Sequence, residues 1–90
     1  MMCRIYRSGK KEGMYLYVNK TDELQRVPEA LLTMFGKAHH AMDILLRPER
    51  KLARADTAEV MVALAEPGYY LQTPPADEDD YKLNLMGEYS

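Results

Sequence analysis

The residues best suited to chemistry stand near the start and the middle of the chain. Cys3 lies close to the amino terminus, and the adjacent histidines His39 and His40 precede Asp43. These types can bind zinc, but zinc sites normally take a second spaced pair of ligands, which the sequence lacks. Alternating apolar residues around Cys3 predict a buried thiol, which behaves as a small hydrophobe. We therefore expect no metal, no cofactor and no catalytic residue here.

Asp43 is unusual because it is a carboxylate within an apolar segment. A buried carboxylate needs a partner, which Arg4, Arg7 or a strand-end amide would supply. A position on an edge strand, with the side chain facing water, is the favoured interpretation.

Four tyrosines fall on expected strands, interleaved with arginine and glutamine. Aromatic side chains on a sheet, next to arginines, can stack on the bases of single-stranded nucleic acid. If a helix covers the sheet, the same rings belong to the core and their hydroxyls reach its edge. The core interpretation is favoured over a binding face for Tyr6, Tyr15, Tyr17 and Tyr70.

Basic residues are concentrated in the first part of the chain. The net charge is +5 over residues 1–54 and −7 over residues 55–90, which gives −2 for the whole chain. This asymmetry is typical of a nucleic-acid surface or of an acidic part that neutralises a basic part within one fold. The negative total favours the second interpretation, because nucleic-acid modules are usually basic. The candidate nucleic-acid-binding residues are Arg4, Arg7, Lys10, Lys11, Arg47, Arg50, Lys51 and Arg54.

Length and composition indicate one small globular domain. The chain has 90 residues, of which 47% are hydrophobic and 29% are charged. Its longest aliphatic runs fall far short of the roughly 20 residues that cross a bilayer. No apolar signal-peptide region follows the first basic residues, and the single cysteine cannot form an internal disulfide. We expect a cytoplasmic protein that has no contact with a membrane.

Two strands joined by a polar turn organise the start of the chain. Met14, Leu16 and Val18 alternate with tyrosines, and Cys3 and Ile5 alternate with Arg4 and Tyr6. The turn between these strands holds two glycines, which can adopt the positive φ of a hairpin loop. The second strand is apolar on both sides, and this predicts helices above and below the sheet.

Helices, strands and polar turns alternate along the rest of the chain. Asp56 is a good N-cap residue with Glu59 three positions later, and Gly36 can end the preceding helix. The predicted elements are a turn at 22–26, a helix at about 28–35, a polar connector at 37–40, a strand at 41–46 buried on both sides, a helix from 56 to about 66, a strand at 69–73 and a helix at 81–86. The order is β-β-α-β-α-β with a C-terminal helix, in an α/β (α+β) fold.

Five segments together resemble the YcgL domain family of gammaproteobacterial proteins: CRIYRS, MYLYV, RVPEALLTMFG, LARAD and GYYLQTPP. The resemblance runs to about Met86, so we expect a single domain over 1–86 and a frayed tail over 87–90. It implies an α/β/α sandwich around a four-stranded sheet. It implies no established activity and no assigned catalytic or binding residue. The resemblance also brings an association with genes that lie beside that of ribonuclease D.

The leading functional hypothesis is a small cytoplasmic binding or adaptor module with no enzymatic activity and a protein partner of unknown identity. The alternative is an RNA-binding accessory protein linked to ribonuclease function, which requires the basic side chains to lie on one face. An RNA-processing hydrolase is a weaker alternative, because it needs a carboxylate pair that the sequence does not display.

The apolar pattern also predicts which side chains form the core. The expected core residues are Cys3, Ile5, Leu16, Val18, Leu31, Phe35, Ile44, Leu46, Val60, Leu64 and Leu71.

The acidic segment Asp77–Asp80 should weaken the binding of anions to the basic segment Arg47–Arg54 by loose electrostatic screening. Changing the four acids to Asn or Gln should therefore tighten the binding of a polyanion at low salt. The gain should fade as the salt concentration rises, because salt screens exposed charges. Binding isotherms for both proteins measure the difference, and equal affinities at low salt would contradict the prediction.

Overall fold

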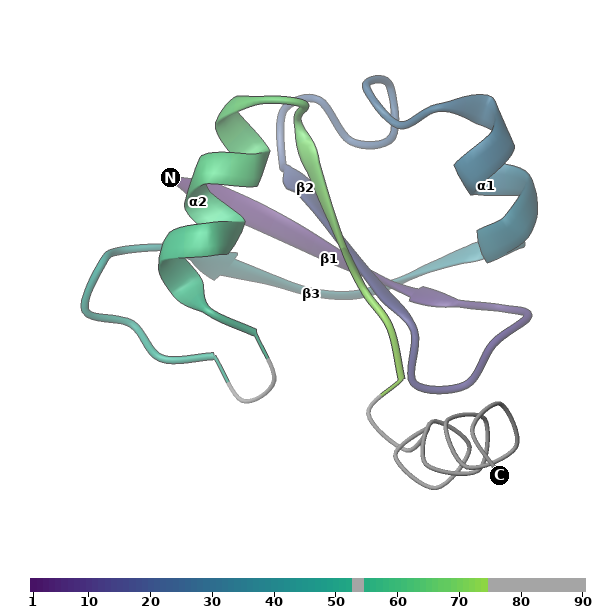
Figure 1. Ribbon diagram of the computed structural model, residues 1–90, viewed down its shortest axis with the longest axis horizontal. Helices are drawn as coiled ribbons and strands as arrows, with labels where there is room; N and C mark the ends of the chain where they lie inside the picture. Colours follow the sequence, from purple (N-terminus) through teal and green to yellow (C-terminus); the bar gives the residue numbers. More distant parts are fainter. Residues whose placement is uncertain (53–54, 75–90) are drawn as a thin grey trace, which may run out of the picture.

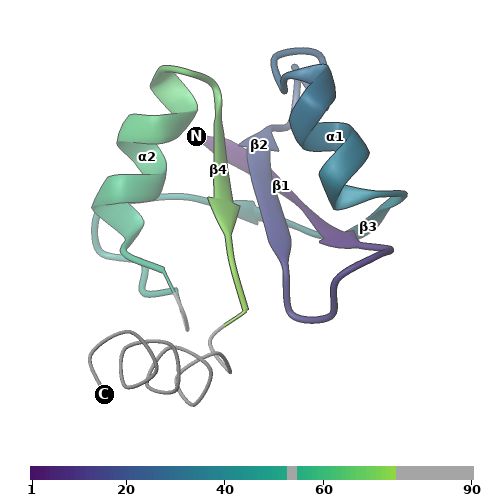
Figure 2. The same cartoon turned by 45° about the vertical axis from the view of Figure 1, so that its right-hand side comes forward.

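The computed structural model describes residues 1–52 and 55–74, which form a four-stranded antiparallel sheet in the order β3-β1-β2-β4. One helix lies on each face of the sheet (Figure 1), and the three layers are clearest in the turned view (Figure 2). The predicted sandwich and element order are confirmed; the helix expected at 81–86 and the acidic segment 77–80 lie outside the described residues. The elements are β1 (Met2–Ser8), β2 (Tyr15–Asn19), α1 (Glu29–Phe35), β3 (Ala38–Leu45), α2 (Thr57–Ala65) and β4 (Tyr69–Gln72).

The β1–β2 hairpin forms the centre of the sheet. Its register runs from Cys3 opposite Asn19 to Arg7 opposite Tyr15. The Ser8 hydroxyl oxygen accepts hydrogen bonds from the backbone N–H groups of Lys10 and Lys11, at 3.1 and 2.9 Å, and so shapes the loop. The hairpin predicted from the alternating pattern is therefore confirmed, with strand ends within a residue or two of those expected.

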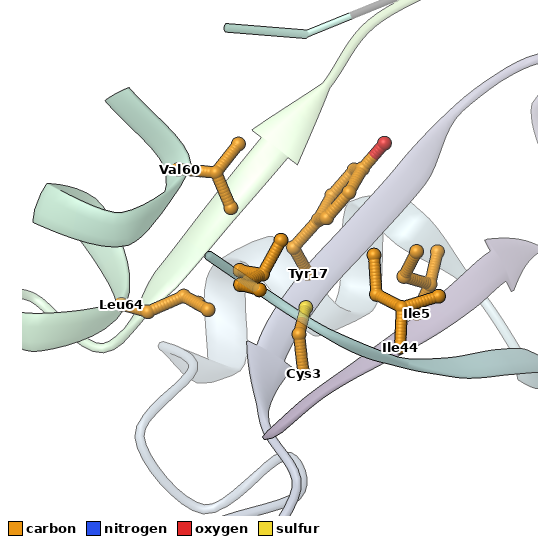
Figure 3. Packing of buried hydrophobic residues seen from close by; sticks show 7 residues of the cluster. Cys3, Ile5, Tyr17, Ile44, Val60 and Leu64 are labelled. Atoms are coloured by element: carbon orange, nitrogen blue, oxygen red, sulfur yellow. The ribbon is translucent and has the colours of Figure 1, made fainter. Parts of the chain in front are cut away.

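Alternate residues of the strands build a separate apolar cluster on each face. On the α2 face, Val60 and Leu64 point from the helix toward Cys3 and Tyr17 (Figure 3). On the α1 face, Phe35 is fully buried in a second cluster with Tyr6, Met14, Leu16, Val18 and Val27. The two-sided apolar character of β2 therefore has the predicted consequence, because each face is covered by its own helix.

The helix ends follow the capping rules. The Asp56 carboxylate accepts hydrogen bonds from the N–H groups of Ala58 and Glu59, at 2.9 and 3.2 Å, as predicted for the start of α2. Gly36 ends α1 with φ of 75°, and a Cβ there would meet Lys10 Cγ at 2.5 Å, so glycine is required for both reasons. Neither helix of the described chain has the length and hydropathy of a membrane span.

The predicted core is largely confirmed. Leu31 and Leu71 are exceptions, because they are partly buried at the margin of the α1-face cluster. The expected residues that are buried are Cys3, Ile5, Leu16, Val18, Phe35, Ile44, Leu46, Val60 and Leu64. Of the four tyrosines, Tyr6 and Tyr17 are buried, while Tyr15 and Tyr70 are partly buried on the α2 face.

The prediction for the third strand was wrong in two respects. The strand begins at Ala38, so His39 and His40 belong to β3 and do not form a connector. β3 is also not buried on both sides: Met42 and Leu45 are 52% and 37% exposed. The reason is its position, because β3 is the outermost strand on one side of the described sheet, whereas α2 packs mainly on β4 and β2. Pairing with β1 overrides the weak strand propensity of the histidines.

Replacing Leu64 with Ala should remove apolar contacts beneath α2 and leave a cavity. The expected loss is roughly 2–5 kcal/mol in the free energy of unfolding, a large share of the stability of a small domain. Urea denaturation measures it. Val62→Ala on the same helix is the matched control, since Val62 is 71% exposed, and it should change stability by no more than about 0.5 kcal/mol. Equal effects of the two substitutions would show that another face of α2 packs on the sheet.

Candidate functional site

A groove of about 390 Å³ opens on the α2 face of the sheet, and we call it the α2-face groove. All four strands and the loop between β3 and α2 contribute to it. Its lining is aliphatic and aromatic except for two basic residues and one amide. The lining residues are Ile5, Tyr15, Tyr17, Ala41, Met42, Ile44, Arg50, Lys51, Leu52 and Gln72.

Strand pairing fixes the floor of the groove. Ile5 lies opposite Tyr17 on β2 and opposite Met42 on β3, so the three side chains form a row across the sheet. The Tyr17 hydroxyl donates a hydrogen bond to Gln72 Oε1 at 2.7 Å and ties β2 to β4. Burial raises the pKa of Tyr17, so this hydroxyl keeps its proton. The floor is therefore rigid and mainly apolar.

The β3–α2 loop places two cations at the rim of the groove. The backbone N–H of Arg50 donates to the carbonyl of Arg47 at 2.9 Å, which closes a turn. The buried Thr57 side chain, at the start of α2, donates to the Arg50 carbonyl. Leu52, which follows Lys51, packs against the core cluster of the α2 face. These anchors hold the loop backbone, while the Arg50 and Lys51 side chains remain exposed.

Arg7 extends the positive charge beyond the groove itself. It is exposed on β1 and lies directly opposite Tyr15 in the β1–β2 register. Directly opposed residues of an antiparallel pair project from the same face, with Cβ atoms about 4.5–5.5 Å apart. Arg7 therefore stands beside Tyr15 on the α2 face, on the face that also carries Arg50 and Lys51.

The other basic residues of the predicted set lie elsewhere. Lys10 donates from Nζ to the Thr33 carbonyl of α1 at 3.1 Å, and Lys11 is exposed in the hairpin loop. Arg47 is exposed in the turn after β3, while Arg54 lies outside the described residues. The described members of the set thus occupy several surfaces, and the α2 face brings together three of them.

Arg4 lies in a separate polar cluster at the β1–β3 pair. Its guanidinium donates two hydrogen bonds to the Asp43 carboxylate, at 2.9 and 3.2 Å, and one to Glu23 at 3.0 Å. His40 Nε2 lies 2.9 Å from Asp43 Oδ1, and Lys20 Nζ lies 3.6 Å from Oδ2. Asp43 therefore combines both interpretations made from the sequence: it is on an edge strand, and Arg4 is its partner.

The electrostatics of this cluster make it a structural link between elements. The hydrogen bonds from Arg4, followed by that from His40, hold the pKa of Asp43 well below its usual range. An ionised carboxylate with such a low pKa is a poor proton donor and a weak base near neutral pH. The arrangement of the whole cluster suits it to a structural role, in which it joins β1, β3 and the turn after β2.

Cys3 is unsuited to attack a substrate. The side chain is completely buried, and burial raises the pKa of the thiol to about 11. A buried thiol that holds its proton is neither a nucleophile nor a metal ligand at neutral pH. Across residues 1–52 and 55–74, no three His, Cys, Asp or Glu side chains are arranged to hold a metal ion.

Sequence reasoning missed most of the groove. It identified Arg50 and Lys51 as binding candidates and Tyr15 and Tyr17 as an aromatic set, but it did not place them together. Met42, Leu52 and Gln72 carried no site prediction, because an apolar residue or an amide has the same local pattern in a core and in a groove. The period-2 alternation shared by Ile5, Tyr15 and Tyr17 is the one signal that could have grouped residues on this face.

Comparison with known proteins bears on the identity of the chain. The profile of the YcgL domain matches residues 3–75, a range that includes all ten residues lining the α2-face groove. The chain belongs to the YcgL domain family. A YcgL domain-containing protein of Pseudomonas fluorescens strain SBW25 is 62% identical over 87 residues, covering 97% of this chain and 89% of that protein.

Further relatives extend the comparison to other genera. A YcgL domain-containing protein of Cellvibrio japonicus is 58% identical over 77 residues, covering 86% of this chain and 79% of the relative. One from Hahella chejuensis is 54% identical over 85 residues, with 94% and 79% covered. The names of these relatives state the YcgL domain and no reaction or ligand. A function for this chain is therefore inferred from its own residues.

The Asp43 cluster should make stability depend on pH. Asp43→Asn should lower the free energy of unfolding at pH 7, because Arg4 and His40 favour the ionised carboxylate in the folded state. A folded-state pKa below the unfolded value, about 3.9, gives a contribution that is complete above that value and is lost as pH falls through the folded pKa. The gap between wild type and Asp43→Asn should therefore narrow below about pH 4.

Urea unfolding at pH 7 and at about pH 2.5 tests this expectation. Glu12→Gln, which neutralises an exposed carboxylate in the hairpin loop, is the control for a general change in net charge. A gap for Asp43→Asn that stays constant between the two pH values would contradict the electrostatic account of the cluster.

Proposed function

We propose that this YcgL protein is a small cytoplasmic binding module, with no enzymatic activity of its own, and that its ligand occupies the α2-face groove. The observation that supports this most directly is the combination of an apolar floor and a basic rim in one cavity. Small-molecule and peptide sites typically combine an apolar lining with a few polar groups that fix orientation.

The chemistry of the groove indicates what it would hold. Tyr15 and Met42 offer apolar contact, and Met42 is 52% exposed although it is a hydrophobic residue. Arg50 and Lys51 would attract negative charge at the rim. We infer a ligand that carries both an apolar surface and an anionic group.

RNA is the second candidate partner. It would be contacted through Arg7, Arg50 and Lys51, and not through all eight basic residues predicted from the sequence. The supporting observation is that Arg50 and Lys51 share the groove with Tyr15, while Arg7 is the neighbour of Tyr15 on the same face. Arginines beside an aromatic ring are suited to the backbone and bases of a single strand. A surface that binds a single strand of RNA suits an accessory role beside a ribonuclease. An adaptor role would instead require the groove to bind a segment of a partner protein.

Met42→Glu tests the groove as the ligand site. The substitution places a negative charge at the apolar floor, so it should repel an anionic ligand. The apolar part of a ligand would also bury the new carboxylate, which is costly without a partner. Tagged wild-type protein and the variant are used to capture ligands from the native cell, with and without ribonuclease. We expect a component that wild type retains to be lost from Met42→Glu.

Val62→Glu is the matched control because it adds the same charge to α2 at a side chain that is 71% exposed and does not line the groove. It should retain the captured component. Equal retention by wild type and Met42→Glu would reject the groove as the ligand site. Ribonuclease-sensitive retention would identify RNA, and resistance to ribonuclease would favour a protein ligand.

A further inference from the structure

The geometry points to a nucleotide as the ligand of the α2-face groove, with its base on Tyr15 and its phosphate at Arg50 and Lys51. This inference rests on the proposed function, in which the groove is the ligand site. A free mononucleotide and one nucleotide of a single-stranded RNA share this chemistry, so both are sources of the ligand.

Tyr15 is the aromatic residue of the groove that a base can reach. Its neighbour Tyr17 is 6% exposed, and the Tyr17 hydroxyl is held by Gln72. Tyr15 is partly buried, so one part of the ring packs on the core cluster and the rest borders the cavity. A ring fixed in this way offers a stacking surface that loses little conformational freedom on binding.

Basic residues from two elements lie on the same face of the sheet as Tyr15. Arg50 and Lys51 come from the β3–α2 loop, and Arg7 comes from β1, directly across from Tyr15. No Asp or Glu is among the described residues that line the groove. An anion bound there would therefore meet attractive charges at the rim, unlike one at Arg4, which Asp43 and Glu23 already neutralise.

The size of the groove favours one nucleotide. Its volume of about 390 Å³ is near the lower end of the roughly 300–1,000 Å³ that small-molecule sites span. The floor of Ile5, Met42 and Ile44 continues from Tyr15 across β1 and β3, where the sugar would contact apolar side chains. The hydrogen-bonded Tyr17–Gln72 pair closes the groove toward β4.

Titrations of the full chain with adenosine 5′-monophosphate, adenosine, inorganic phosphate and an octamer of oligouridylate test the inference. Amide chemical shifts in nuclear magnetic resonance spectra locate each ligand and give its affinity. We expect shifts at Tyr15, Ile44 and Arg50–Leu52 with the monophosphate or with the octamer. Adenosine and phosphate alone should bind more weakly than the monophosphate, because each lacks one half of the contacts.

Two sets of variants assign the contacts. Arg50→Ala/Lys51→Ala should weaken octamer binding and reduce the magnitude of the slope of log K against log salt by about 0.7, because the two cations share one phosphate contact. Lys11→Ala/Lys37→Ala removes the same charge from exposed positions outside the groove, and should leave the slope nearly unchanged.

Tyr15→Leu should weaken binding roughly 5- to 150-fold, while Tyr15→Phe keeps the ring and should bind nearly as wild type does.

The outcomes separate this inference from the proposed function. Binding of the monophosphate alone identifies a free nucleotide, and binding of the octamer identifies a single strand; either supports the inference. It is overturned if neither ligand shifts the groove residues, or if both double variants lose affinity equally. The proposed function survives that result when Met42→Glu still loses the component captured by wild type, since the groove then holds a ligand of another class.

Discussion

The sheet needs cover on both faces, because β2 carries Leu16 and Val18 on one side and Tyr15 and Tyr17 on the other. In the described part of the chain, residues 1–52 and 55–74, two short helices of 7 and 9 residues provide this cover. A nine-residue helix is only about 14 Å long at 1.5 Å per residue. α2 therefore covers the end of its face that holds Cys3, and the part of that face around Tyr15 and Met42 forms a groove.

The same contacts that complete the fold also position the rim of the groove. Thr57 begins α2 and is hydrogen-bonded to the carbonyl of Arg50, while Leu52 packs on the core cluster. Folding of α2 onto the sheet thus fixes the backbone of the Arg50–Leu52 segment at the same time. A binding surface fixed in advance loses less conformational entropy when a ligand arrives, which favours affinity.

The polar residues of β3 have a different role, at the margin of the sheet. An outer strand with open backbone groups can pair with another chain, and charged side chains or a bulge reduce this tendency. β3 has both features: Asp43 with His40, and an irregularity in its pairing with β1 between Ile5 and Tyr6. The carboxylate that looked out of place in an apolar segment thus links β3 to β1 through Arg4 and puts a charged residue on the outer strand.

The sequence alone determined the element types, the hairpin, the Asp56 cap and most of the core, because alternation, capping and glycine positions act over a few neighbouring residues. Membership in the YcgL family was also readable from short segments in order. Tertiary structure decided the start and exposure of β3, since His39 and His40 become strand residues through pairing with β1, 30 or more positions away in the sequence. It also decided the groove, because Tyr15, Met42, Arg50 and Gln72 meet through strand order and loop packing, which local patterns do not encode.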